Sequence, residues 1–201
     1  MTYSLTEERE LQIIYQALSD EDTIFNPTNH SYFNLAGHDS GSVLEQMVWI
    51  RASHFSQTDS LLIPDGKEIP VADTPMDFTQ AKAIGQDLKR DYLPLRWAGG
   101  YDHNYILDKE EGQLQLAASL CDPKSGRKME VFTQLPGIQL YSGNQIPRGS
   151  AGKDGVSYQP YDGVCLETQY VPNAINLPMC LPPILKGGQA KELKTVYRFS
   201  W

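Results

Sequence analysis

The sequence predicts an all-β protein, an antiparallel β-sandwich or barrel, formed as a single domain by residues 1–201. Three observations predict this fold class. Apolar residues recur at every second position in several short segments, turn-forming residues separate these segments, and almost no segment has helical periodicity. A chain of 201 residues can bury a substantial core in one domain, and no repeat or linker marks a boundary.

The first expected element is a hairpin over residues 2–17. Within it, Leu11, Ile13, Tyr15 and Ala17 alternate with other residues and so share one face of a strand. The sequence "TEER" before them has the character of the connecting turn. This hairpin begins without a lead-in segment, so we expect its sheet to need partners from elsewhere.

Further strands are expected wherever short apolar or alternating segments lie between turns. The turns contain "PDGKE", "AGGYD", "DPKSGR" and "GNQIPRG", which are rich in Gly, Pro, Asp and Asn. The expected strands lie within residues 44–52, 112–121, 128–135, 138–143, 163–171 and 196–201. Only residues 77–89 are compatible with a short helix, and Gly85 argues against a long one.

The charge and hydropathy of the chain exclude several classes of partner. Its net charge is −8, from 17 basic and 25 acidic residues, so neither nucleic acid nor an anionic membrane is an expected partner. No run reaches the roughly 18 apolar residues of a spanning helix, and the N-terminus lacks the basic start and apolar centre of a signal peptide. We therefore expect a cytoplasmic location.

The cysteines predict neither disulfides nor a structural metal. Cys121, Cys165 and Cys180 are odd in number and have no CxxC spacing. This pattern is typical of reduced thiols in a protein of the cell interior.

Polar residues interleaved with aromatic ones mark a candidate site for a hydroxyl-rich ligand. They cluster in "TNHSYFNL", "GGYDHNYIL", "PGIQLYSGNQ" and "GVCLETQYVPNAIN". Carboxylates and amides bind the hydroxyl groups of a sugar, and aromatic faces pack on its C–H face. A histidine and a carboxylate on separate strands would also supply a general acid and a general base. The candidates are His30, Asp102, His103, Gln139 and Glu167.

Each candidate also has a structural interpretation. Glu167 directly follows a strongly apolar segment, where a carboxylate is rarely buried without a partner, and this favours a functional role. Asp102 would also suit a turn, and His103 would point away from Asp102 if both lie on one strand. We expect His103 to be structural, and His38 and His54 to be hydrogen-bonded loop residues.

Five motifs in order give the sequence a family resemblance. The segments "NPTNHSYFNLAG", "LLIPDGKEIPVADTPMDF", "GGYDHNYIL", "SGRKMEVFTQLPGIQLYSGN" and "GVCLETQYVPNAINLP" together resemble the galactose mutarotase (aldose 1-epimerase) family over essentially the whole chain. The resemblance implies a large antiparallel β-sandwich with a sugar cleft on a concave sheet face. It also implies interconversion of the α and β anomers of a free aldose such as galactose or glucose, without a cofactor.

The resemblance assigns roles by matching motif. His30 corresponds to the general acid and Glu167 to the general base. Asp102 and Gln139 correspond to ligands of the sugar hydroxyls, and Ser31 and Tyr32 are expected in the same wall as His30.

The sequence departs from the family at two positions and in length. Asn173 stands where an acidic residue is usual, and Leu177 where histidine is common. The family's N-terminal part, with an Asn-Arg pair and a second histidine that contact the sugar, has no counterpart here, so we expect a sandwich incomplete on its N-terminal side. Three interpretations follow: an active mutarotase, a non-catalytic sugar-binding sandwich, or one half of a split enzyme. The last two predict self-association or a complementary N-terminal fragment as partner.

Overall fold

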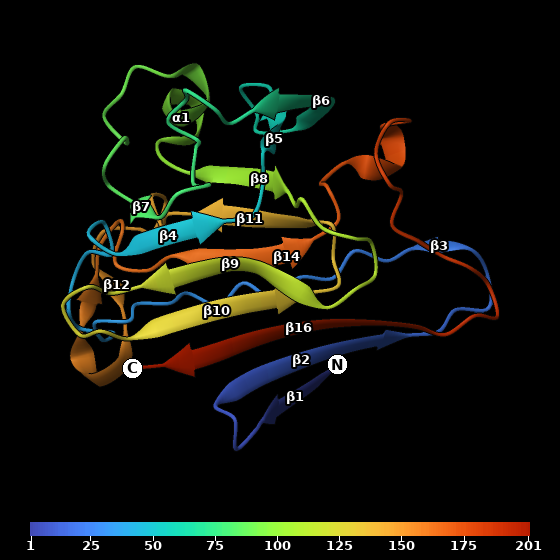
Figure 1. Cartoon of the computed structure of the whole chain (residues 1–201), viewed down its shortest axis with the longest axis horizontal. Helices are drawn as coiled ribbons and strands as arrows, with labels where there is room; N and C mark the ends of the chain where they lie inside the picture. Colours follow the sequence, from blue (N-terminus) through green and yellow to red (C-terminus); the bar gives the residue numbers. More distant parts are fainter.

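A computed structural model describes residues 1–201 and shows two antiparallel β-sheets packed against each other (Figure 1). The seven-stranded sheet runs, from one edge to the other, β1 (Thr2–Leu5), β2 (Glu10–Ala17), β16 (Lys191–Ser200), β10 (Lys128–Thr133), β9 (Gln115–Cys121), β4 (Met47–Ile50) and β7 (Lys82–Ala83). The five-stranded sheet runs β14 (Cys165–Gln169), β11 (Gly137–Tyr141), β8 (Asp102–Ile106), β5 (His54–Thr58) and β6 (Pro64–Pro70). The expected β-sandwich is confirmed.

The other elements are short. Two small ladders pair β12 (Ser150–Ala151) with β13 (Ser157–Tyr158), and β3 (Thr23–Ile24) with β15 (Ile184–Leu185). The helical elements are α1 (Leu93–Ala98) and the 3-10 turns η1 (Lys153–Gly155) and η2 (Ala174–Asn176). None of these helices has the length and apolar character needed to cross a lipid bilayer.

The core lies between the two sheets, and alternation along the strands builds it. In β14, Leu166 and Thr168 face the seven-stranded sheet, while the residues on either side of them face outward. Ile138 and Leu140 of β11 pair with these inward residues and belong to the same core cluster. Val131 of β10 is a core residue on the opposite sheet.

Two polar contacts cross this core and tie β14 to β16. The Thr168 hydroxyl lies 2.6 Å from the hydroxyl of Thr195, which is also 3.2 Å from that of Thr133. The Tyr197 hydroxyl donates to the Leu166 carbonyl at 2.9 Å. Because these side chains are buried, the hydroxyls depend on one another as hydrogen-bond partners. The contacts fix the position of β14 over the other sheet.

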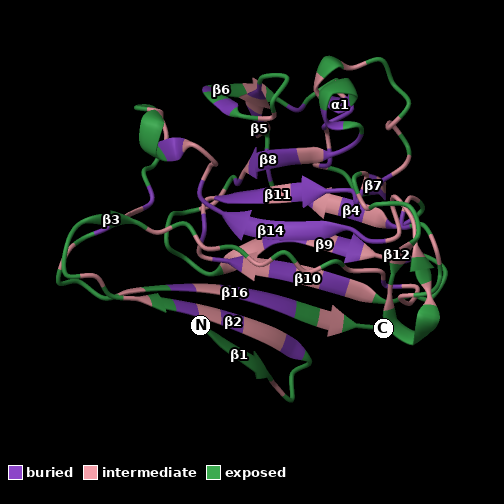
Figure 2. Ribbon diagram, turned by 180° about the vertical axis from the view of Figure 1, so that it is seen from behind, coloured by how far each residue is buried: buried purple, intermediate pink, exposed green.

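One edge of the seven-stranded sheet is uncovered. All of β1 is exposed, as its colour in Figure 2 shows. Tyr3 and Leu5 pair with Ile13 and Leu11, and so point to the core side of the sheet, yet they are 51% and 85% exposed. The hydrogen bond from the Asn29 amide to the Tyr3 hydroxyl, at 3.1 Å, leaves most of this corner of the sandwich uncovered. The predicted hairpin over residues 2–17 is confirmed, including the exposed edge that it implied.

The segments expected as strands at 44–52, 112–121, 128–135, 138–143, 163–171 and 196–201 contain β4, β9, β10, β11, β14 and the end of β16. Residues 77–89, the segment that was compatible with a short helix, instead hold the short strand β7, and the helix α1 comes just after them. Tertiary contacts override helix propensity here. The buried Lys82 amine donates to Asp87 and to the Pro75 carbonyl, and Gly85 packs tightly on Leu44.

Besides the two-residue strands, β5, β6 and β8 were not among the expected strands, and β6 replaces an expected turn. The sequence "PDGKE" opens β6, which pairs with the equally unforeseen β5. As the last strand of its sheet, β6 tolerates Pro64 and Pro70. Gly66 takes φ +90°, and the pairing shifts register between Ser56 and Thr58. Proline and glycine therefore mark an irregular edge strand here.

We expect Thr195→Val to destabilise the chain by about 1–3 kcal/mol, because the substitution keeps the shape of the side chain but leaves the Thr168 hydroxyl buried without a partner. Urea unfolding followed by circular dichroism measures the change. Thr23→Val is the matched control, since Thr23 lies on an exposed strand and its hydroxyl has no hydrogen bond. Equal stabilities of the two variants would contradict a structural role for the hydroxyl contacts.

Candidate active site

The outer face of the five-stranded sheet carries a polar cluster. Residues that pair directly across neighbouring strands point to the same face of a sheet. Residues two apart on one strand also share a face. Two rows therefore lie side by side on this face: Glu167, Gln139 and Asn104 in one, and Cys165, Tyr141 and Asp102 in the other. Three strands far apart in sequence thus place their polar side chains together.

Side-chain amides lock the cluster in one arrangement. Gln139 donates to Asp102 Oδ1 at 2.8 Å and accepts from Gln169 at 3.1 Å. Gln169 also donates to Asn104 Oδ1 at 3.2 Å, and Asn104 donates to the Ser56 hydroxyl at 3.1 Å. Each amide is therefore oriented by its neighbours, which presents the acceptor and donor groups in fixed directions.

Gly137 makes room for this network. It lies in the third row of the same face, beside Gln169. A Cβ atom at Gly137 would lie 2.7 Å from Asn104 Oδ1 and 3.2 Å from the Gln169 carbonyl oxygen. The missing side chain allows the Asn104 amide to lie flat across β11 and to reach Gln169.

His30 comes from a loop that runs beside the free edge of β14. At one end of this loop, residues 26–33, the backbone of Phe33 pairs with Val164 in both directions, at 2.8 and 2.9 Å. At the other end, the Asn26 side chain bonds both the N–H and the carbonyl of Tyr170, at 2.9 and 3.1 Å. Between these two attachments, the loop leaves the sheet edge and carries His30 over the polar face.

The imidazole of His30 lies between a carboxyl group and a thiol. Its Nε2 is 3.6 Å from Glu167 Oε1, and its Nδ1 is 3.4 Å from Cys165 Sγ. The Tyr32 ring stacks on it at a centroid distance of 5.0 Å, and Tyr141 meets it edge-on at 5.8 Å. The His30 side chain is 52% exposed and that of Glu167 9%. The site is therefore open on the histidine side and closed behind the carboxyl group.

Burial shifts the acidity of both carboxyl groups. It raises the pKa of Glu167 to about 7, with the charge of Asp102 adding to this and His30 opposing it. Burial likewise raises the pKa of Asp102, against the hydrogen bond from Gln139 and the charge of His30. A carboxyl group with a pKa near neutrality exchanges protons readily at physiological pH. The arrangement of Glu167 and His30 is suited to proton transfer to and from a small polar ligand.

Comparison with known proteins identifies the family to which the chain belongs. The family described as aldose 1-epimerase matches residues 1–198. The chain belongs to this family. A galactose mutarotase from Sus scrofa is 39% identical over 200 residues, which are 100% of this chain and 56% of that protein. An aldose 1-epimerase from Haemophilus influenzae is 34% identical over 180 residues, 89% of this chain and 51% of that protein.

Solved structures of the aldose 1-epimerase family share the fold. A galactose 1-epimerase from Lactobacillus acidophilus superposes with a TM-score of 0.80 at 27% identity, over 98% of this chain and 55% of the other. An aldose epimerase homologue from C. elegans gives a TM-score of 0.85 at 25% identity, over 98% and 58%. The chain thus spans little more than half the length of these relatives.

The structure brings four of the six predicted site residues into one cluster: His30, Asp102, Gln139 and Glu167. Tyr32 joins them through its stacking on His30. Ser31 lies in the same loop, but its only hydrogen bond runs from its backbone N–H to Asn29, so no hydrogen bond links it to the cluster.

The remaining histidines lie outside the cluster, as expected. His103 is fully buried on the opposite face of β8, where burial lowers its pKa to about 4 and keeps it neutral. His38 contacts Tyr158 and Asp154 in a loop region. His54 lies 3.0 Å from the Ser53 hydroxyl; it is in strand β5 rather than in a loop.

Sequence analysis missed four residues of the cluster: Asn104, Tyr141, Cys165 and Gln169. Each lies two residues from a predicted site residue on the same strand, so strict alternation would have found them. Asn104 was missed because residues around Asp102 were equally compatible with a turn.

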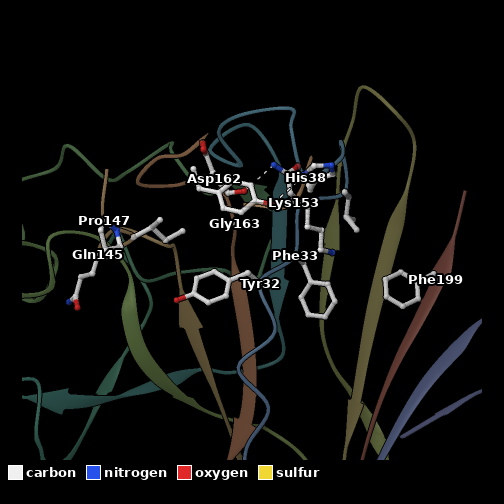
Figure 3. A pocket seen from close by; sticks show the side chains of 13 residues that line it. Tyr32, Phe33, His38, Gln145, Pro147, Lys153, Asp162, Gly163 and Phe199 are labelled. Carbon is white, nitrogen blue, oxygen red and sulfur yellow. Dashed lines mark hydrogen bonds between the residues drawn. The ribbon is translucent and has the colours of Figure 1, made fainter. Parts of the chain in front are cut away.

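A separate cavity of about 620 Å³ adjoins the cluster behind Tyr32. Its wall is mixed polar and apolar, and Figure 3 shows the aromatic rings of Tyr32, Phe33 and Phe199 along it. Neither His30 nor Glu167 lines this space. Tyr32 is therefore the one aromatic ring that faces both the cavity and the imidazole.

The raised pKa of Glu167 predicts that stability falls as pH rises from about 5 to 8. In this window the unfolded carboxyl group, with a usual value of 4.5, is ionised, whereas the folded one keeps its proton until about pH 7. Folding then binds a proton, so raising the pH opposes folding. Glu167→Gln should remove this dependence, and its stability gain over the native sequence should be larger at pH 8 than at pH 5.

Urea midpoints measured across this pH range test the expectation. Glu21→Gln is the control, because Glu21 is exposed and should leave the pH profile unchanged. A parallel profile for Glu167→Gln and the native sequence would show that the carboxyl group titrates normally.

Proposed function

We propose that this chain provides the acid–base pair of an aldose 1-epimerase, which interconverts the α and β anomers of free aldohexoses such as galactose or glucose. The observation that carries the proposal is the 3.6 Å approach of His30 Nε2 to Glu167 Oε1 at the open end of a polar sheet face. Ring opening requires proton transfer at two oxygens bonded to the same sugar carbon. An acid and a base that lie close together can serve both oxygens at once.

The reaction follows from the chemistry of the two groups. The Glu167 carboxylate takes the proton of the anomeric hydroxyl while the His30 imidazolium gives one to the ring oxygen, and the C1–O5 bond breaks. The open aldehyde rotates about its C1–C2 bond. The ring then closes on the other face of the carbonyl, with the two residues in reversed roles. Since nothing is oxidised and no group is transferred, the step calls for no cofactor.

The rest of the cluster suits the recognition of a sugar. Asp102 and Gln139 now satisfy each other, and both would exchange this contact for hydroxyl groups of the ligand. The rings of Tyr32 and Tyr141 stand beside His30 and offer apolar faces for the C–H groups of the ring. Ser31 lies in the same loop as His30, and we assign it to the binding wall as well.

A second candidate function has a specific observation in its favour. The uncovered inner face at Tyr3 and Leu5 favours one half of a split mutarotase or a non-catalytic sugar-binding sandwich. The presence of both proton-transfer groups at close approach favours the enzyme. The three free thiols suit the reducing cytoplasm, which we propose as the location.

We expect Glu167→Gln and His30→Asn each to lower turnover by roughly a hundredfold or more, the usual contribution of a general acid or base. The glutamine keeps the shape of the side chain but accepts no proton, and the asparagine donates none to the ring oxygen. Polarimetry on freshly dissolved α-galactose and α-glucose measures the rate. His54→Asn is the control, because this histidine contacts Ser53 away from the cluster. Full activity in either of the first two variants would refute the assignment.

The isolated chain should be a mutarotase at least about a hundredfold weaker than a full-length relative, since losing one preorganised charge-stabilising donor costs on the order of 3 kcal/mol. The family resemblance implies an arginine and a histidine that this chain does not supply. The exposed β1 edge should also promote self-association. Polarimetry and analytical ultracentrifugation of the chain, alone and with the N-terminal part of the Sus scrofa galactose mutarotase, measure both effects.

Recovery of turnover on mixing would support the split arrangement. A monodisperse monomer with the turnover of a full-length relative would rule it out, and would show that the retained strands are sufficient.

A further inference from the structure

Cys165 belongs to the cluster but takes no part in the proposed reaction. It is fully buried, and it lies two residues before Glu167 on the same face of β14. Its sulfur lies against the imidazole of His30. A thiol, an imidazole and a carboxyl group meet here, and these three groups are the common protein ligands of zinc.

We propose that His30, Cys165 and Glu167 together bind a thiophilic divalent cation such as Zn²⁺, and that this ion blocks the active site. The binding step stands on the geometry alone. The inhibitory consequence rests on the proposed function of the same residues.

The distances suit an ion of this size. One ligand atom from each residue lies within 4.8 Å of the other two. His30 Nδ1 is 3.4 Å from the sulfur, and Nε2 is 3.6 Å from the Glu167 oxygen. With Zn–S near 2.3 Å and Zn–N near 2.0–2.1 Å, two ligand atoms of a tetrahedral ion lie roughly 3.3–3.6 Å apart. The two short contacts are made by different nitrogens of the ring, so the half-exposed imidazole would have to rotate and turn one nitrogen towards an ion held between the thiol and the carboxyl group.

The charge of the surroundings also favours a cation. Glu167 and Asp102 are both withdrawn from solvent, and His30 is the only basic group that acts on either of them. The two carboxyl groups also disfavour the thiolate of Cys165. A bound dication would balance the negative charges of the thiolate and of Glu167, with Asp102 as a further negative neighbour. On binding, the thiol proton and any proton on Glu167 pass to solvent.

The donor set selects the kind of metal. Mg²⁺ and Ca²⁺ prefer oxygen ligands, whereas a set of thiolate, imidazole and carboxylate favours Zn²⁺ and its spectroscopic substitute Co²⁺. Three protein ligands leave a fourth position for water. The ion would occupy the Glu167 lone pair and one His30 nitrogen, so neither residue could transfer a proton to a sugar. The expected effect is reversible inhibition.

Cobalt substitution tests the site without relying on catalysis. Titration of the purified chain with CoCl₂ should give the strong visible bands of tetrahedral Co²⁺ and a sulfur-to-cobalt charge-transfer band, at one ion per chain. Cys165→Ser should abolish the charge-transfer band. His30→Asn and Glu167→Gln should each weaken binding of Zn²⁺ at least tenfold in calorimetry. The matched control is Cys121→Ser with Cys180→Ser, which removes the other two thiols and should leave the spectrum unchanged.

Three results would overturn the proposal: the weak spectrum of octahedral Co²⁺, a charge-transfer band that persists in Cys165→Ser, or loss of the band in the control. If Cys165→Ser fails to fold, the metal affinity of His30→Asn tests the site instead. The His30 side chain is half-exposed on a loop, so its replacement should leave the fold intact. In an active chain, Zn²⁺ should abolish mutarotation and a chelator should restore it. If the chain shows no mutarotation, the cobalt spectrum still tests the metal site, so the two proposals fail separately.

Discussion

The register of β14 is the constraint on which the site depends. Successive residues of a strand point to opposite faces, so a shift of one residue would bury Glu167 in the core and expose Leu166. The strand is held from its core side by the Thr168 contact to Thr195 and by the Tyr197 contact to the Leu166 carbonyl. These contacts are specific to one register, because only alternate residues of β14 reach β16. The core thus determines which side chains the outer face presents.

The site is a place where stability is given up for chemistry. Two carboxyl groups are withdrawn from water here, and burial raises the pKa of each, with the charge of Asp102 raising that of Glu167 further. A sheet face of this kind would be more stable with apolar or neutral side chains. The amide network around Gln139 and Asn104 offsets part of this cost, because every amide has a partner. The network therefore supports both the fold and the orientation of the ligand-binding groups.

Much of the fold was predictable because alternation along a strand directly reflects burial on one face. The hairpin at residues 2–17 and the strands around Val131, Gln139 and Glu167 were found in this way. The strands within residues 54–70 were not predicted, because Pro64 and Gly66 are typical turn residues. A strand tolerates them here only because β6 lies at the edge of its sheet. A short helix was compatible with residues 77–89 but does not form. The buried Lys82 and its partner Asp87 hold this segment in another conformation, and helix propensity contains no information about such tertiary contacts.

The sequence allowed most residues of the candidate site to be predicted, but not how their side chains lie relative to one another. Family resemblance pointed to His30, Asp102, Gln139 and Glu167, whereas the approach of Cys165 to His30 spans 135 positions of sequence and depends on the path of one loop. That loop is attached at Phe33 by backbone pairing and at Asn26 by a single side chain. His30 and Glu167 are therefore held by supports of different kinds, a loop and a strand, although they are neighbours in space. Opening of residues 27–32 would break no strand of either sheet, so moving the histidine costs less free energy than moving the strand that holds the glutamate.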